Sequence, residues 1–223
     1  MRYEEAVALV KKTRLVAILR GIPLDKAVPV AQALYEGGVR VLEFTFDHDD
    51  PDCVEHTCQR VSMVREALGD KLMLGCGTVL TPEEVRKARE AGAQIIISPS
   101  VEVDVIAETR KLGLVSMPGV LTPTEITAAY RAGADFVKLF PAGVLGVGYV
   151  RAVRGPLGFI PMTAVGGVRP ENVAEFLDAG CAGFGVGSEM VQKAAVKNGD
   201  YEAITRRARE FVDAIQAWEA QQA

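Results

Sequence analysis

The sequence predicts an α/β protein folded as a (β/α)₈ TIM barrel, because eight strand-like runs alternate with longer amphipathic stretches along its 223 residues. The runs are rich in Val, Ile, Leu, Phe and Gly, which is typical of parallel strands buried on both faces. An open doubly wound sheet is the competing architecture, but it requires neither eight units nor even spacing. The expected strands span residues 15–20, 40–45, 71–78, 94–99, 114–118, 136–141, 159–165 and 182–187.

The helices between these strands have recognisable start and stop signals. Thr81 and Thr122 are each followed by a proline and an acid, the pattern of an N-cap with proline in the first turn. Glycines end most of the helical stretches. An extra N-terminal helix over residues 3–12 is expected to cover the bottom of the barrel, and residues 201–216 form the last helix. No linker divides the chain, so residues 1–223 are expected to form a single domain.

The composition excludes several classes of protein. Apolar residues make up 49% of the chain and charged residues 24%, as in soluble globular proteins. The formal charge of −4 and the lack of a basic run argue against a nucleic-acid partner, and the strand-sized apolar runs argue against a membrane. The N-terminus lacks the apolar core of a signal peptide, and the four cysteines include no CxxC pair. We therefore expect reduced thiols and a cytoplasmic location.

Polar side chains inside the expected strands are candidate site residues, because burial of an unpaired charge is costly. Lys138 shares a strand face with two phenylalanines, and Glu43 shares a face with a valine and a threonine. Arg20 and Thr78 end two further strands. All four lie at or near the carboxyl ends of strands, where the active sites of (β/α)₈ barrels are built.

Lys138 and Glu43 together predict covalent chemistry on a carbonyl group. Burial among aromatic rings disfavours a charged ammonium, and a neutral amine can attack a ketone to form a Schiff base. A nearby carboxylate could then move protons during carbinolamine dehydration and during cleavage or formation of a C–C bond. The competing interpretation is a structural buried ion pair. Because buried charges concentrate at working sites, the catalytic interpretation is favoured.

Two glycine-containing turns predict an anion site. Gly166 and Gly167 follow the seventh strand, and Gly187 and Ser188 follow the eighth. In these barrels the loops after the last two strands commonly form a phosphate site, because glycine lets backbone N–H groups approach an anion. The alternative is that both are only tight turns between a strand and a helix.

Several longer motifs occur in order over nearly the whole chain. The most specific are Gly-Thr-Val-Leu at 77–80 and Lys-Leu-Phe-Pro at 138–141. The others are Leu-Glu-Phe-Thr at 42–45, Ile-Ser-Pro at 97–99, Pro-Gly-Val-Leu-Thr-Pro-Thr-Glu at 118–125, Val-Gly-Gly-Val at 165–168 and Val-Gly-Ser at 186–188. With these motifs the sequence resembles the 2-keto-3-deoxy-6-phosphogluconate (KDPG) and 4-hydroxy-2-oxoglutarate (KHG) aldolase family. The resemblance implies a class I aldolase that needs no metal or other cofactor, and a homotrimer.

By position, the resemblance implies that Lys138 forms the Schiff base with pyruvate and that Glu43 is the general acid and base. It also implies a keto-acid pocket and a phosphate site. The residues implied for these two sites are Arg20, Thr78, Pro99, Phe140, Gly166, Gly167, Gly187 and Ser188.

Two positions depart from the family's best-known members. Asp47 stands where those members have an arginine that engages an anionic group of the substrate, and an acid there should repel such a group. Val165 stands where they have a threonine before Gly-Gly, although members acting on the galactonate-derived phosphate ester also have valine. Thr163, on the same strand face, could supply the missing hydroxyl to the substrate.

The predicted function is reversible cleavage of a 2-keto-3-deoxy sugar acid, its phosphate, or a 4-hydroxy-2-oxo acid to pyruvate and an aldehyde. A phosphosugar isomerase or epimerase with Glu43 as base is one alternative, and a non-catalytic sensor of phosphorylated ligands is another. The acidic segment 47–50 could bind a divalent cation, but it also fits a polar loop that leads into a helix. A Schiff-base lysine needs no metal, so no metal site is expected.

Overall fold

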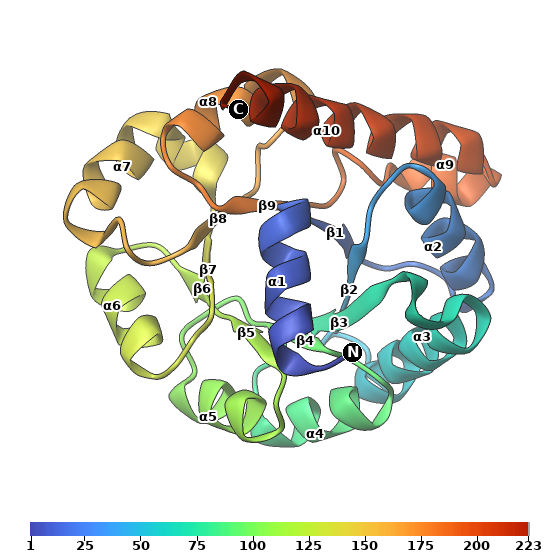
Figure 1. The fold of residues 1–223 in the computed structure, drawn as a ribbon. Helices are drawn as coiled ribbons and strands as arrows, with labels where there is room; N and C mark the ends of the chain where they lie inside the picture. Colours follow the sequence, from blue (N-terminus) through green and yellow to red (C-terminus); the bar gives the residue numbers. More distant parts are fainter. Residues whose placement is uncertain (223) are drawn as a thin grey trace.

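The structure is a computed structural model that describes residues 1–222 and contains a barrel of parallel strands surrounded by helices (Figure 1). Around the barrel the strands follow the order β5-β4-β3-β2-β1-β9-β8-β7-β6, and all neighbours are parallel. Only Pro118 separates β5 from β6, so these two segments count as one of the eight predicted strands. The strands are β1 (Leu15–Leu19), β2 (Val41–Thr45), β3 (Met73–Gly77), β4 (Ile95–Ile97), β5 (Val115–Met117), β6 (Gly119–Val120), β7 (Val137–Leu139), β8 (Met162–Val165) and β9 (Gly183–Val186).

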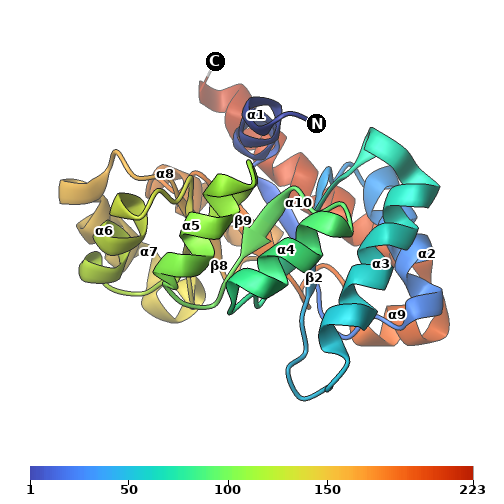
Figure 2. The same ribbon diagram turned by 90° about the horizontal axis from the view of Figure 1, so that it is seen from below.

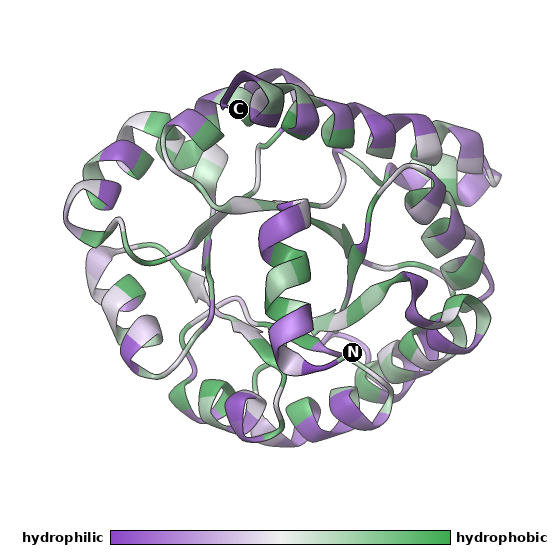
Figure 3. Cartoon of the chain, in the orientation of Figure 1, coloured by the Kyte–Doolittle hydropathy of each residue, from purple (hydrophilic) through white to green (hydrophobic). Residues whose placement is uncertain are grey.

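All helices except α1 lie around the outside of the strands, with hydrophobic residues toward the strands and hydrophilic residues outward (Figure 3). The two predicted N-caps are confirmed: the hydroxyl of Thr81 accepts from the backbone of Glu84, and that of Thr122 accepts from the backbone of Glu125. The helices are α1 (Tyr3–Thr13), α2 (Ala27–Glu36), α3 (Cys53–Leu68), α4 (Pro82–Glu90), α5 (Val103–Lys111), α6 (Pro123–Arg131), α7 (Ala142–Leu157), α8 (Val173–Asp178), α9 (Lys193–Asn198) and α10 (Tyr201–Gln222). Short 3₁₀ turns span Leu24–Lys26, Gly69–Lys71 and Pro170–Asn172.

The extra N-terminal helix closes one end of the barrel, as the sequence predicts. α1 lies across the ring of strands in Figure 1 and on one side of the barrel in Figure 2. Ala6 and Val10 on its buried face join an apolar cluster that fills the interior of the barrel. The other members of this interior cluster are Phe136, which directly precedes β7, and the strand residues Val16, Val41, Met73, Ile95, Ile97, Val115 and Met117. The amino-terminal end of the barrel is therefore packed and closed.

A second, larger apolar layer lies between the strands and the outer helices. Leu42, Phe44 and Phe46 belong to it, so the strand face opposite Glu43 packs against helices as expected. Among residues 1–222, no helix combines the length and the apolar character that are needed to cross a bilayer.

Most observed strands are a few residues shorter than the predicted runs: β1 ends at Leu19, before Arg20, and β8 begins at Met162 rather than at residue 159. The third strand ends at Gly77, and Thr78 follows it with φ 59°. The turn after β9 leads into the short helix α9, and only then into α10. α10 continues to Gln222 because tertiary contacts hold its end: Trp218 donates to Asp178, and the guanidinium of Arg14 stacks on its ring.

Candidate active site

Glu43 lies inside the barrel on β2 with 1% of its surface exposed. Its carboxyl group occupies space that the neighbouring strand leaves open, since a Cβ atom on Gly77 of β3 would lie 1.6 Å from Oε1. This Oε1 atom is buried and has no hydrogen-bond partner within residues 1–222. Burial raises the pKa of Glu43, and the positive charges of Lys138 and Arg20 partly oppose that rise. The site therefore contains a carboxyl group that can hold a proton where an exposed one would lose it.

Lys138 lies on β7 with 8% of its surface exposed. Its strand neighbours are Gly119 of β6 and Thr163 of β8, and its Nζ lies 5.5 Å from the centre of the Phe140 ring. In residues 1–222 no ion pair or hydrogen bond joins it to Glu43, although its charge acts on that carboxyl. If Lys138 and Glu43 served only to stabilise the fold, we would expect a direct ion pair between them. Without that contact, burial of the two groups is not compensated by their attraction. The open arrangement leaves polar atoms available to a ligand.

The other residues predicted for the keto-acid pocket lie around this pair. Arg20 directly follows β1 and is exposed, yet its charge reaches Glu43. Thr78 directly follows Gly77 and is partly buried. Pro99 packs so closely on Gly119 that a Cβ there would lie 2.2 Å from its carbonyl oxygen. Thr163 is buried beside Lys138. The structure thus brings the predicted residues to one end of the barrel, and their contact with a substrate remains a proposal.

The predicted anion turns directly follow the adjacent strands β8 and β9. Gly166 and Gly167 have φ of 86° and 74°, a conformation that favours glycine. The carbonyl of Gly166 accepts a 2.8 Å hydrogen bond from the N–H of Gly143, which lies too close to Gly167 for either residue to carry a side chain. The other turn begins at Gly187, whose carbonyl accepts from two backbone N–H groups further along the turn. Gly187 is partly buried, and Ser188 beside it is exposed.

The loop between β2 and α3 contains contacts that the sequence did not predict. His48 Nε2 lies 2.9 Å from the carbonyl oxygen of Thr78, and His56 Nδ1 lies 2.7 Å from a carboxylate oxygen of Asp50. Within residues 1–222 no group of three His, Cys, Asp or Glu side chains is arranged to hold a metal ion. His48 thus joins this loop to Thr78, and Asp50 joins it to His56 at the start of α3.

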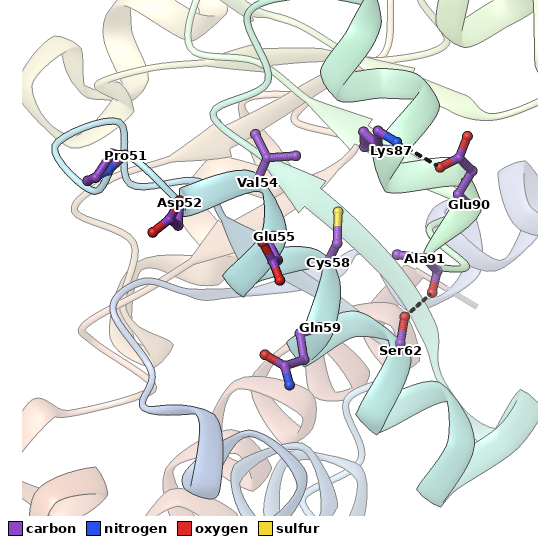
Figure 4. A pocket seen from close by; sticks show the side chains of 10 residues that line it. All are labelled: Pro51, Asp52, Val54, Glu55, Cys58, Gln59, Ser62, Lys87, Glu90 and Ala91. Carbon is purple, nitrogen blue, oxygen red and sulfur yellow. Dashed lines mark hydrogen bonds and ion pairs between the residues drawn. The ribbon is translucent and has the colours of Figure 1, made fainter.

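A groove between α3 and α4 lies outside this site, and none of its lining residues is a predicted site residue (Figure 4). Two of its polar groups bind one another or the backbone: Lys87 pairs with Glu90 at 3.4 Å, and Ser62 donates to the carbonyl of Ala91. Burial raises the pKa of the Cys58 thiol to about 11, so it is not the thiolate that a nucleophile would need.

Comparison with known proteins decides the family. The family model described as "KDPG and KHG aldolase" matches residues 7–207. The chain belongs to the KDPG and KHG aldolase family. The chain is 38% identical over 180 residues to the 2-dehydro-3-deoxy-6-phosphogalactonate aldolase of Escherichia coli K12, covering 80% of this chain and 85% of that one.

Solved structures agree with this assignment. A structure described as native KDPGal has 36% sequence identity and a TM-score of 0.83, covering 94% of this chain and 96% of that one. The KDPG aldolase of Legionella pneumophila, with pyruvate captured as a covalent carbinolamine intermediate, has 27% identity and a TM-score of 0.81. It covers 92% of this chain and 96% of that one. As an aldolase of this family, the chain is a lyase, and its fold is the predicted (β/α)₈ barrel.

Proposed function

We propose that this aldolase cleaves a 2-keto-3-deoxy sugar acid, its phosphate, or a 4-hydroxy-2-oxo acid to pyruvate and an aldehyde, through a Schiff base on Lys138. One observation carries the proposal: a buried carboxyl without a hydrogen-bond partner at Oε1 shares the carboxyl end of the barrel with a buried lysine. The covalent carbinolamine in the Legionella pneumophila relative supports an amine nucleophile. The substrate classes follow from the names of the relatives and from the motif resemblance.

The proposed reaction begins when the neutral amine of Lys138 attacks the C2 carbonyl of the substrate. The carbinolamine loses water, with Glu43 supplying the proton, and a protonated imine forms. Glu43, through a water molecule, then removes the proton of the C4 hydroxyl. The C3–C4 bond breaks, its electron pair moves toward the imine nitrogen, and the aldehyde leaves.

The resulting enamine is protonated at C3, and water hydrolyses the imine to release pyruvate and free Lys138. The imine nitrogen is the electron sink in this scheme, so the chemistry requires no metal or organic cofactor. The raised pKa of Glu43 supports its double role, because a group that both accepts and donates a proton works best when it titrates near the operating pH.

For substrate binding we propose two zones. The keto-acid end lies among Arg20, Thr78, Pro99, Phe140 and Thr163, and an anionic far end lies against the turns that contain Gly166, Gly167, Gly187 and Ser188. The exposed acid at Asp47, where an arginine is usual, favours an aldehyde fragment whose anionic group lies away from the β2–α3 loop.

We also propose a homotrimer in the cytoplasm. Large exposed apolar side chains follow the carboxyl ends of neighbouring strands, which supports an interface on that side of the barrel. They are Leu80, Val103, Leu121 and Val144. The four free cysteines suit a reducing compartment. Analytical ultracentrifugation is expected to give three times the chain mass, and a monomer at micromolar concentration would contradict the trimer.

Borohydride trapping tests the central proposal. Reduction of the enzyme with pyruvate should add one reduced pyruvyl group at Lys138, located by peptide mass spectrometry. A coupled lactate dehydrogenase assay should detect pyruvate released from the gluconate- and galactonate-derived phospho-keto acids or from 4-hydroxy-2-oxoglutarate. An isomerase or epimerase would give neither the adduct nor pyruvate, and a sensor would bind sugar phosphates without turnover.

A further inference from the structure

Thr78 has a backbone conformation that threonine seldom adopts. Its φ is 59°, and Arg14 is the only other non-glycine residue with positive φ among residues 1–222. A β-branched side chain in this region is strained, so neighbouring contacts must hold it there. Thr78 directly follows Gly77, the residue whose missing side chain leaves space for the carboxyl of Glu43.

His48 provides such a contact from the loop between β2 and α3. Its Nε2 lies 2.9 Å from the carbonyl oxygen of Thr78. A carbonyl oxygen can only accept, so this ring nitrogen carries the hydrogen and donates it. In Figure 2 the β2–α3 loop projects on the side of the barrel opposite α1. The loop follows the carboxyl end of β2, the strand that carries Glu43.

The ring of His48 is itself held in place. The ring of buried Phe46 meets it edge-on with centres 6.2 Å apart, and Phe46 N–H donates to the carbonyl of Gly77 at 2.8 Å. The other ring nitrogen, Nδ1, lies 3.9 Å from Glu84 and 3.9 Å from the sulfur of Cys53. Contacts on two sides thus fix the ring, and its Nε2–H is directed at Thr78.

We propose that His48 is a positioning residue: its hydrogen bond to the Thr78 carbonyl holds the left-handed turn and so places Thr78 for the keto-acid end of the substrate. This inference rests on the proposed function, in which Thr78 lines the keto-acid pocket. His48 acts through Thr78 and touches no reacting atom. Its effect falls on binding in the ground state and transition state alike, so KM rises while kcat is preserved.

The test uses substitutions of His48 that distinguish the loss of its hydrogen-bond donor from the loss of its aromatic ring. His48→Phe keeps the aromatic edge against Phe46 and removes the donor, whereas His48→Gln places an amide N–H near the position of Nε2. His48→Asn carries the same amide one methylene shorter and serves as the matched control. We expect the Phe and Asn variants to raise KM for pyruvate in the condensation direction about 2- to 12-fold, the range for one lost hydrogen bond. The Gln variant should stay within about twofold of wild type, and kcat should change little in all three.

A double-mutant cycle shows whether His48 acts through Thr78. In a Thr78→Ala background, His48→Phe should raise KM no further, because the side chain that it positions is already gone. An equal rise in both backgrounds would overturn the proposal and indicate direct contact with substrate. Unchanged KM in His48→Phe, or a loss of thermal stability without a KM change, would also overturn it and leave His48 a structural loop contact.

Failure of this inference is distinguishable from failure of the proposed function. Wild-type enzyme is first trapped with pyruvate and borohydride. If wild-type Lys138 is not modified, the proposed function is wrong and the inference falls with it. If Lys138 is modified and the His48 variants keep wild-type KM, only the inference is wrong.

Discussion

The two ends of the barrel differ in what fills them. At the amino-terminal end, apolar side chains from five strands, from α1 and from Phe136 just before β7 form the interior cluster. At the carboxyl end, Glu43, Lys138 and Thr163 are buried among glycines of the neighbouring strands. The amino-terminal end is filled by closely packed apolar side chains. At the carboxyl end, glycines leave space beside the charged side chains. This contrast is the physical basis for placing stability at one end and chemistry at the other.

Replacement of the lysine should have the largest effect at the polar end. Lys138→Met keeps a side chain of similar length in an apolar setting but lacks the amine, so imine trapping and pyruvate release should both fall below detection. Thermal unfolding should show a folded protein, because the buried charge is removed without leaving a cavity. Cleavage at more than a few per cent of the wild-type rate would refute the role of Lys138.

Replacement of the Glu43 carboxyl group should have the second-largest effect on activity. Glu43→Gln should still form the imine slowly, yet steady-state turnover should fall about 10²- to 10⁴-fold, the usual contribution of a general acid and base. Stopped assays of pyruvate release, with parallel borohydride trapping, separate the two steps. An unchanged turnover rate would remove Glu43 from the proposed mechanism.

A glycine at the polar end should matter almost as much as the charged residues. Gly77→Ala places a Cβ where Oε1 of Glu43 lies, so the carboxyl must move. Because a displacement of about 1 Å can cost about 100-fold in rate, we expect a loss of about 10- to 100-fold in kcat. Gly148→Ala is the control, since no neighbouring heavy atom lies within 4 Å of the added Cβ, and its kcat should equal that of wild type. Equal kcat in both variants would show that the space above Gly77 is not needed.

Substitutions at the closely packed amino-terminal end should change the free energy of unfolding and leave the kinetic constants unchanged. Val10→Ala removes two methyl groups from the side of α1 that joins the interior cluster, and about 1–3 kcal/mol of unfolding free energy should be lost. KM and kcat should stay at wild-type values, because the change lies at the opposite end from Lys138. Lys11→Ala, exposed on the same helix, should change stability by less than about 0.5 kcal/mol. A kinetic defect in Val10→Ala would show that the two ends are coupled.

The sequence predicts only part of this difference between the packed and the polar end of the barrel. Lys138 and Glu43 stand out because each is a charge within an apolar strand, and the N-caps follow from Thr-Pro pairs. The space over Gly77 depends on the register of β2 against β3, which no local pattern contains. The contact between His48 and Thr78 depends on a left-handed threonine, contrary to its ordinary preference. The additional turns of α10 depend on Asp178 and Arg14, which lie far from Trp218 in sequence.

The smallest expected effect is a pH-dependent difference in stability at Glu43. Burial raises the pKa of Glu43 in the folded chain above its value in the unfolded chain. Its protonated form is therefore the one that folding favours, and the stability it contributes is lost as pH rises from the unfolded pKa through the folded pKa. Glu43→Gln keeps a neutral side chain at every pH, so it should melt above wild type at pH 7.5, by a few degrees for each kcal/mol. The difference should shrink as pH falls toward 4, because the Glu43 carboxyl then becomes mostly protonated in the unfolded chain as well as in the folded one. Thermal unfolding at pH 4, 5.5 and 7.5 measures it, and a wild type that melts higher at pH 7.5 would mean that the ionised carboxylate is stabilised in the folded barrel.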